Sequence, residues 1–219
     1  MAKDSEPAPP FKSGHRLALL ICVLLTGVTL VDILTAHSYY SEAKLYWSGF
    51  PEPEESGMAY LLERLILGSL YGLLQLPAAI LFLVWVHRVY RNLAALGAQN
   101  LTYSPGWAVG GFLVPLLNLV RPFFVVSEIW KASRPDLRDG DAWQATRTSP
   151  LIAVWWFGWL AAVTSSLIVY ARPARHPMWV RWDVIAVETA DIAAAVLAMV
   201  VIWQIDKRQS EKRQRRMSG

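Results

Sequence analysis

The stretch GGFLVPLLNLVRPFFVV, residues 110–126, decides the fold of this chain. It is apolar enough to enter a lipid bilayer, yet it contains Pro115, Asn118, Arg121 and Pro122. Proline lacks a backbone N–H and clashes with the preceding helical turn, so the stretch cannot form one regular helix. An arginine at the centre of a bilayer also costs about 2.5–3.5 kcal/mol on insertion scales. The stretch therefore predicts a broken helix rather than a simple membrane span.

The break divides the segment into two short helices. We expect the first from about Trp107, a turn near NLVRP, and a second helix through FFVVSEIWKAS. In the second helix Glu128 and Lys131 have the spacing of an ion pair, and its apolar residues favour a place at the membrane interface. The amide of Asn118 can satisfy backbone groups at the turn. The alternative is a ligand-binding role for Asn118 and Arg121, since many transporters bind substrates at broken helices.

The composition is that of a membrane protein. Apolar residues make up 54% of the 219 residues and charged residues 17%, against roughly 25% charged in soluble domains. Four runs have about the 20 apolar residues that a span requires, at residues 17–36, 58–86, 151–170 and 184–205. The apolar core of the first run exceeds that of a signal peptide, so we expect an uncleaved span.

The basic residues decide between four spans and five, because cytoplasmic loops carry an excess of lysine and arginine. If segment 107–131 enters the membrane and returns, fifteen of these residues lie on the side of the N-terminus. Four lie opposite, namely Lys44, Arg172, Arg175 and Arg181. If the segment crosses, the counts become eight and eleven, which reverses the rule. The charges favour four spans with both termini in the cytoplasm, and five spans remain the alternative.

Five charged residues inside the expected spans form a candidate site. Asp32, Glu63, Arg64, Glu188 and Asp191 all fall in the outer halves of their spans, so they can meet. In one interpretation Arg64 bridges Asp32 or Asp191 and the cluster is structural. In the other, four carboxyl groups against one arginine allow an acid to carry a proton or to bind a cation. A third possibility is that the acids simply face water.

Small residues predict how two of the spans pack. Gly68 and Gly72 lie one and two turns from Arg64 and form a small-xxx-small pair, which allows a second helix to approach closely. We therefore expect the second span to pack against the fourth.

The segment YRNLAALGAQNLTYSPGWAVGGFLVPLLNLVRPFFVVSEIWKAS, residues 90–133, resembles the signature of the bacterial membrane family called domain of unknown function 4328. The features that carry the resemblance are ALGA, SPGWAVGG, Pro115, NLVRP and EIWKAS, together with Trp155 and Trp156. The resemblance extends from about Met58 to Trp203. It implies a polytopic bacterial membrane protein, and it implies no particular reaction.

These observations predict an all-α membrane protein with a cytoplasmic tail at 1–16, one polytopic domain at 17–205 and a basic tail at 206–219. No catalytic motif and no metal-ligand spacing occurs, so we expect no enzyme activity, no cofactor and no metal. The expected role is interaction with protein or lipid partners in the bacterial inner membrane. The alternative is a small transporter or proton-coupled permease that uses the acidic cluster. We expect anionic lipids at the cytoplasmic face, a protein partner or homo-oligomer, and no nucleic acid.

Overall fold

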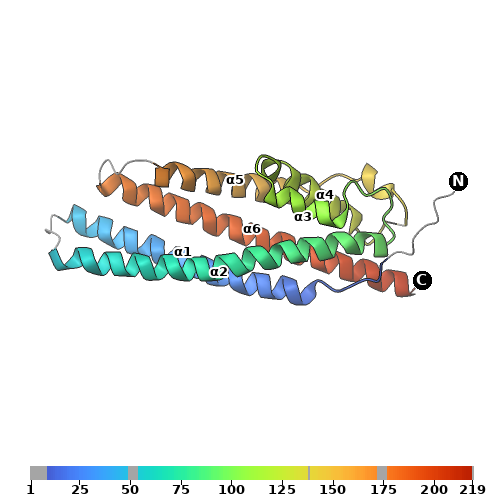
Figure 1. Ribbon diagram of the computed structural model, residues 1–219, viewed down its shortest axis with the longest axis horizontal. Coiled ribbons are helices and arrows are strands. Elements are labelled where there is room, and N and C mark those ends of the chain that lie inside the picture. The colour runs from blue at the N-terminus through green and yellow to red at the C-terminus, as the bar shows by residue number, and fades with distance from the viewer. Residues whose placement is uncertain (1–8, 49–53, 138, 172–176, 219) are drawn as a thin grey trace. The chain divides into compact units, whose positions relative to one another are not determined.

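The computed structural model describes residues 9–48, 54–137, 139–171 and 177–218, which are almost entirely helical. These residues contain six α-helices, one after another in the sequence. Figure 1 labels them in order. They are α1 His15–Trp47, α2 Glu54–Ala95, α3 Pro105–Leu113, α4 Arg121–Ala132, α5 Pro150–Ala171 and α6 Pro177–Ser218. Two short 3-10 helices, Leu117–Leu119 and Ala142–Ala145, and an isolated β-bridge between Ala98 and Gly140 complete the secondary structure of the described residues. The expectation of an all-α protein is confirmed.

Four of these helices are long and apolar enough to cross a membrane. Their candidate spans are His15–Leu45, Met58–Ala95, Pro150–Val169 and Trp182–Ser218, so the expectation of four spanning helices is confirmed. Three of the helices are much longer than the bilayer requires. With 33 residues, α1 is about 50 Å long against a hydrocarbon core of about 30 Å. It continues to Trp47 because no glycine or proline interrupts residues 37–48.

The chain forms two compact units where the sequence predicts one membrane domain at 17–205. The first, here called the hairpin unit, contains Met1–Leu20, Ile80–Ala153 and Val200–Gly219. The second, here called the cavity unit, contains Ile21–Ala79 and Val154–Met199. Arg138, Arg172 and Arg175 of the charge count, and the side chain of Arg181, lie outside the described residues.

The core of the hairpin unit is built on the last part of α2. Trp85, Val86, Val89, Tyr90 and Leu93 are fully buried, and their spacing places them on one face of the helix. Side chains of α4 and α6 are buried in the same unit, namely Val125, Ile129, Ile202 and Ile205. Within this unit α3 and α4 lie side by side, as Figure 1 shows.

The two prolines of the opening stretch mark the ends of the break between α3 and α4. The helix α3 ends at Leu113, and Val114 is extended because the following Pro115 disfavours helical geometry. The helix α4 begins at Arg121, and Pro122 occupies its first turn, where no N–H is needed. The expected broken helix is present, although its break covers residues 114–120 and thus begins before NLVRP. With nine and twelve residues, neither helix is long enough to cross a bilayer.

The two ends of the segment that contains α3 and α4 lie next to each other. The N–H of Gly140 donates to the carbonyl of Gly97 at 2.8 Å, and the N–H of Gln99 donates to the carbonyl of Gly140 at 2.9 Å. Both glycines have positive φ angles, 84° and 112°. A β-carbon at Gly97 would also lie 2.2 Å from Oδ1 of Asp139. The chain therefore leaves α2, forms the two short helices, and returns to the end of α2.

Two expectations for α4, an outward apolar surface at Ile129 and Trp130 and a Glu128–Lys131 ion pair, are not met among the described residues. Ile129 and Trp130 are buried, because α4 packs inside the hairpin unit. Glu128 is only 5% exposed, and its carboxylate accepts a hydrogen bond from the N–H of Thr102 at 2.7 Å. This carboxylate is thus turned toward the chain that leads into α3.

In the cavity unit, Gly27 rather than Gly68 and Gly72 makes the closest helix contact. A β-carbon at Gly27 on α1 would lie 3.1 Å from Cδ1 of Leu74 on α2. At Gly68 and Gly72 it would meet no atom within 4 Å. The predicted tight packing of the second span through these two glycines is therefore wrong, because their face of α2 is open.

Candidate functional site

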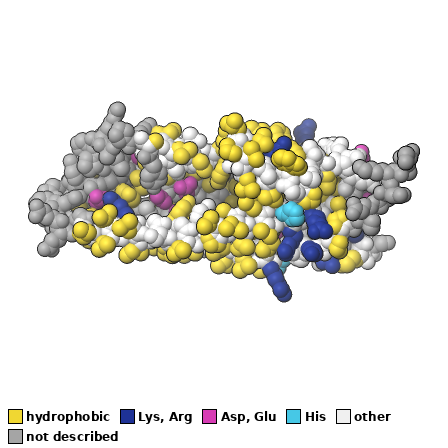
Figure 2. Space-filling view, viewed as in Figure 1, with side chains coloured by type: hydrophobic (Ala, Val, Ile, Leu, Met, Phe, Trp, Pro, Cys, Tyr) yellow, Lys and Arg dark blue, Asp and Glu magenta, His cyan; other side chains and the backbone are white. Residues whose placement is uncertain are grey.

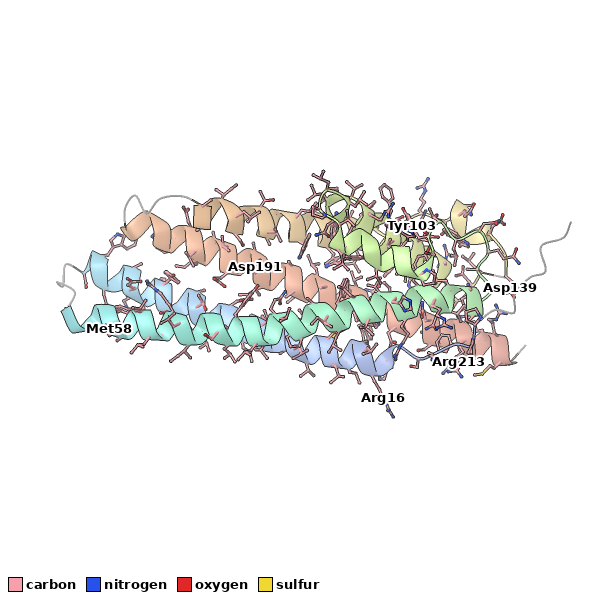
Figure 3. All side chains as sticks on the ribbon, viewed as in Figure 1. Arg16, Met58, Tyr103, Asp139, Asp191 and Arg213 are labelled. Atoms are coloured by element: carbon pink, nitrogen blue, oxygen red, sulfur yellow. The ribbon has the colours of Figure 1, made fainter. Side chains whose placement is uncertain are left out.

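The cavity unit contains a cavity of about 380 Å³ between its helices. Acidic side chains are visible in magenta on the face drawn in Figure 2, among hydrophobic side chains in yellow. Asp191 is labelled on α6 in Figure 3. Residues of all four long helices line the cavity, namely Asp32, Thr35, Ser38, Tyr39, Arg64, Leu67, Gly68, Tyr71, Ser166, Val187, Glu188 and Asp191. Four of the five charged residues singled out in the sequence thus lie around one cavity.

Asp32 is the most unusual residue of this cavity. Its side chain is 1% exposed, and neither of its carboxylate oxygens has a hydrogen-bond donor within the described part of the chain. The carboxyl group of Glu188, which is 8% exposed, lies within hydrogen-bonding reach of it. Two carboxylates have no donor between them, so this contact becomes a hydrogen bond only when one of them carries a proton. The pair is therefore built to hold a proton or another cation.

Arg64 does not neutralise these acids. Its guanidinium forms an ion pair with Glu42 on α1 and lies 4.4 Å above the ring of Tyr39. The expectation that Arg64 bridges Asp32 or Asp191 is therefore wrong. The reason is that α1 continues past residue 36 and carries Glu42 into the unit, where it is 6% exposed.

As a result, three carboxyl groups face the cavity without a cationic partner among the residues that the structure describes. Among the described residues, no lysine, arginine or histidine nitrogen forms an ion pair with Asp32, Glu188 or Asp191. Glu188 and Asp191 are separated by three positions on α6, so their side chains project from the same face. Three carboxylates around one cavity repel one another, so binding of a positive group there is favourable.

Glu63 does not belong to this group. It is exposed and does not line the cavity, because neighbouring residues of a helix point about 100° apart and Arg64 faces inward. Glu42 is the residue that the sequence reasoning missed, since it lies beyond the first apolar run, which ends at residue 36. The absence of a helix breaker between residues 37 and 48 is the signal that could have found it.

The residues singled out in the broken helix serve different purposes. Trp107 and Arg121 line a second cavity, of about 440 Å³, in the hairpin unit, while Pro115 and Pro122 bound the break. The backbone N–H of Asn118 donates to the carbonyl of Val114 at 3.0 Å. The backbone of Asn118 thus stabilises the turn. The sequence had instead suggested this role for its side-chain amide.

Glu128 connects α4 to the chain in front of α3. Burial raises the pKa of its carboxyl group above the ordinary value of 4.5, while the hydrogen bond from the Thr102 N–H opposes this shift. The hydroxyl of Tyr90 accepts a hydrogen bond from the N–H of Tyr103 at 2.9 Å, one residue further along. Glu128 and Tyr90 together fix the backbone that leads into the second cavity.

The four long apolar helices define a multi-pass membrane protein. Among the residues that the structure describes, no group of three or more His, Cys, Asp or Glu side chains could hold a metal ion. A family model described as domain of unknown function DUF4328 matches residues 54–207. The chain therefore belongs to this family. The match includes Arg64, Arg121, Glu188 and Asp191, whereas Asp32 and Glu42 precede it. Neither the curated proteins nor the solved structures include a match to the chain.

Proposed function

We propose that this protein is a small, non-enzymatic membrane transporter that binds a small organic cation in the acidic cavity and exchanges it with protons. The observation that carries the proposal is Asp32, a buried carboxylate that faces a cavity and lacks a hydrogen-bond donor among the described residues. Intramembrane acids are costly and usually mark substrate or proton pathways.

The charge and size of the cavity support an organic cation as the ligand class. Three carboxyl groups that form no ion pair within the described residues favour a cation over an anion. A volume of about 380 Å³ exceeds the space of a bare metal ion and lies at the lower end of small-molecule sites. The ring of Tyr71, which also lines the cavity, is a suitable neighbour for an alkylammonium group, whereas the ring of Tyr39 already lies beneath Arg64.

Proton exchange follows from the contact between Asp32 and Glu188. A proton between the two carboxyl groups and a bound cation are alternative ways to compensate the same charge. Binding of one therefore opposes binding of the other. This competition is the minimal requirement for a proton-coupled antiporter.

Liposomes that contain the purified protein and an internal pH-sensitive dye test the proposal. With a pH gradient imposed, added tetramethylammonium should release internal protons in the wild type. Asp32→Asn should slow this release by about tenfold or more, because a charge-assisted contact is worth about 1.5–3 kcal/mol. Glu63→Gln removes an acid that lies outside the cavity and should leave the rate unchanged. An Asp32→Asn variant as fast as the wild type would refute the role of the cavity.

We further propose that the segment with α3 and α4 enters the membrane and returns, and that both termini lie in the cytoplasm of a bacterial cell. The hydrogen bonds that join Gly140 to Gly97 and to Gln99 support this topology, because a segment whose ends are adjacent begins and ends on the same side. A lone cysteine at the exposed Ala142, with Cys22 replaced by alanine, should resist an impermeant maleimide until the cells are lysed. Labelling in intact cells would contradict the topology.

A second candidate is a role through protein or lipid partners without transport. The end of α3 and the turn that follows it favour this candidate, since Leu113 is 65% exposed and Leu116 is 80% exposed. Such side chains fit lipid, a protein partner or a second copy of the chain. A folded protein that catalyses no exchange in liposomes but copurifies with one defined partner would favour this candidate.

A further inference from the structure

We propose that the second cavity, in the hairpin unit, binds the phosphate group of an anionic phospholipid through Arg121. This site is distinct from the acidic cavity, and the proposal does not depend on transport. The cavity has a volume of about 440 Å³ and is lined by Thr102, Tyr103, Ser104, Trp107, Leu117 and Arg121. Tyr103 is labelled in Figure 3.

The side chain of Arg121 is held in place without an acidic partner. Its guanidinium lies 5.3 Å from the ring centre of Tyr103 and 5.5 Å from that of Trp107. Its aliphatic part crosses α3 at Gly111, where a β-carbon would lie 2.2 Å from Cδ of Arg121. Within the described part of the chain, the guanidinium forms no ion pair with a carboxylate. A fixed cation with unused donors is therefore available to a ligand.

The donors around this cavity match a phosphate. A guanidinium presents several N–H donors in one plane and binds phosphate in a bidentate way. The hydroxyl oxygen of Ser104 accepts from the N–H of Trp107 at 3.3 Å, which leaves its O–H free to donate into the cavity. The rings of Tyr103 and Trp107 hold the guanidinium by cation–π contacts and do not use its N–H groups.

The surroundings of Arg121 favour a lipid phosphate over a free phosphate ion. The turn that precedes Arg121 exposes large apolar side chains, with Leu116 at 80%, Leu119 at 52% and Val120 at 55%. A phospholipid presents an anionic group next to acyl chains. It therefore complements a cation that borders an apolar surface, whereas inorganic phosphate would leave that surface uncovered.

Native mass spectrometry of the detergent-solubilised full chain tests the proposal. The wild type should retain phosphatidylglycerol over phosphatidylcholine. Arg121→Gln should lower retention of phosphatidylglycerol by about tenfold, as expected for loss of a bidentate, charge-assisted contact. Arg91→Gln is the matched control, because it removes an equal charge from an exposed position of the same unit. Equal retention by the Arg121→Gln and Arg91→Gln variants would overturn the proposal.

A second variant tests the position of Arg121 without changing the charge. Gly111→Ala forces the arginine away from α3 and should also reduce retention, whereas Gly106→Ala, whose β-carbon meets no atom within 4 Å, should not. If Arg121→Gln fails to fold, unchanged retention in the Gly111→Ala variant still overturns the proposal. Displacement of phosphatidylglycerol by inorganic phosphate would assign the site to the free ion and contradict the lipid.

Discussion

The hairpin unit and the cavity unit each bury a polar side chain whose partners can be compared, Gln209 in the first and Asp32 in the second. In the hairpin unit, Gln209 is 2% exposed and donates to the carbonyl of Val89 at 2.9 Å and to the hydroxyl of Ser133 at 3.2 Å. Its carbonyl oxygen accepts from Asn92 at 3.1 Å. In the cavity unit, the carboxylate of Asp32 has no donor among the described residues.

The contrast between Gln209 and Asp32 distinguishes a structural polar side chain from a candidate binding residue. A buried hydrogen-bond network whose members are satisfied stabilises one arrangement of helices, and Gln209 joins α6 to α2 and to the end of α4 in this way. A buried polar group without a partner costs about 1–3 kcal/mol, so its persistence calls for a ligand that supplies the missing contact. This reasoning assigns stability to the network around Gln209 and binding to Asp32.

Loss of the ion pair between Arg64 and Glu42 should have the largest effect on stability, because Glu42 is a buried charge of the cavity unit with a cationic partner. Arg64→Gln removes the guanidinium that forms an ion pair with the buried Glu42 and should lower the free energy of unfolding by about 3 kcal/mol. Thermal unfolding in detergent measures this loss. The double variant with Glu42→Gln should recover part of it, and an additive loss would show that the two groups do not interact.

Gln209→Leu tests the network of the hairpin unit. It removes three hydrogen bonds and should reduce stability by about 2 kcal/mol, because Asn92 and Ser133 lose their buried partner. Gln144→Leu is a suitable control. Gln144 is exposed and forms one hydrogen bond, to the carbonyl of Asn100, so the change should stay within about 0.5 kcal/mol. Similar losses of stability in the two variants would show that the buried network around Gln209 stabilises the protein no more than an exposed hydrogen bond does.

Glu128 gives the hairpin unit a defined pH dependence. Because burial raises the pKa of its carboxyl group, its contribution to stability is complete below the ordinary value of 4.5 and is lost as the pH rises through the raised value. Glu128→Gln cannot titrate, so its stability relative to the wild type should increase with pH. Melting temperatures from about pH 4 to about pH 8 measure this trend. Parallel curves for the two proteins would contradict it.

Asp136 serves as the matched control for this measurement. The hydrogen-bonded guanidinium of Arg134 lowers the pKa of Asp136, so its contribution is present above the ordinary value of 3.8 and is lost as the pH falls. The stability of Asp136→Asn relative to the wild type should therefore change in the opposite sense, and only slightly, because the pair is exposed.

The smallest expected effect concerns the glycines of the cavity unit. Gly72→Ala should increase stability by about 0.5–1 kcal/mol, since the β-carbon meets no atom and alanine favours the helix. Gly27→Ala should gain less or lose stability, because its β-carbon lies 3.1 Å from Leu74. Equal gains in thermal unfolding experiments would show that α1 and α2 are not in close contact there.

Sequence reasoning recovers features that depend on local properties. The four long helices follow from the length and hydropathy of their runs, and the break between α3 and α4 follows from Pro115 and Pro122. The end of α1 was missed because a helix that continues beyond the apolar run has no hydropathy signal. That extension brings Glu42 to Arg64 and so changes the partner of the arginine.

The candidate site shows the same limit. The positions of Asp32, Glu188 and Asp191 in the outer halves of their apolar runs predict that they lie at similar depths in the membrane. The structure brings the three residues to one cavity. The rotation of α2 about its axis could not be derived, because it depends on the neighbouring helices. This rotation leaves Glu63 exposed and opens the face that carries Gly68.

The central claim is that the acids of the cavity hold a proton that a cation can replace. A hydrophobic carbodiimide, which reacts with protonated carboxyl groups from within the membrane, tests it most directly. Peptide mass spectrometry should locate the modification at Asp32 or Glu188, and tetramethylammonium should slow the reaction. Modification confined to the exposed Glu63, or a rate at Asp32 and Glu188 that the cation does not change, would contradict the claim.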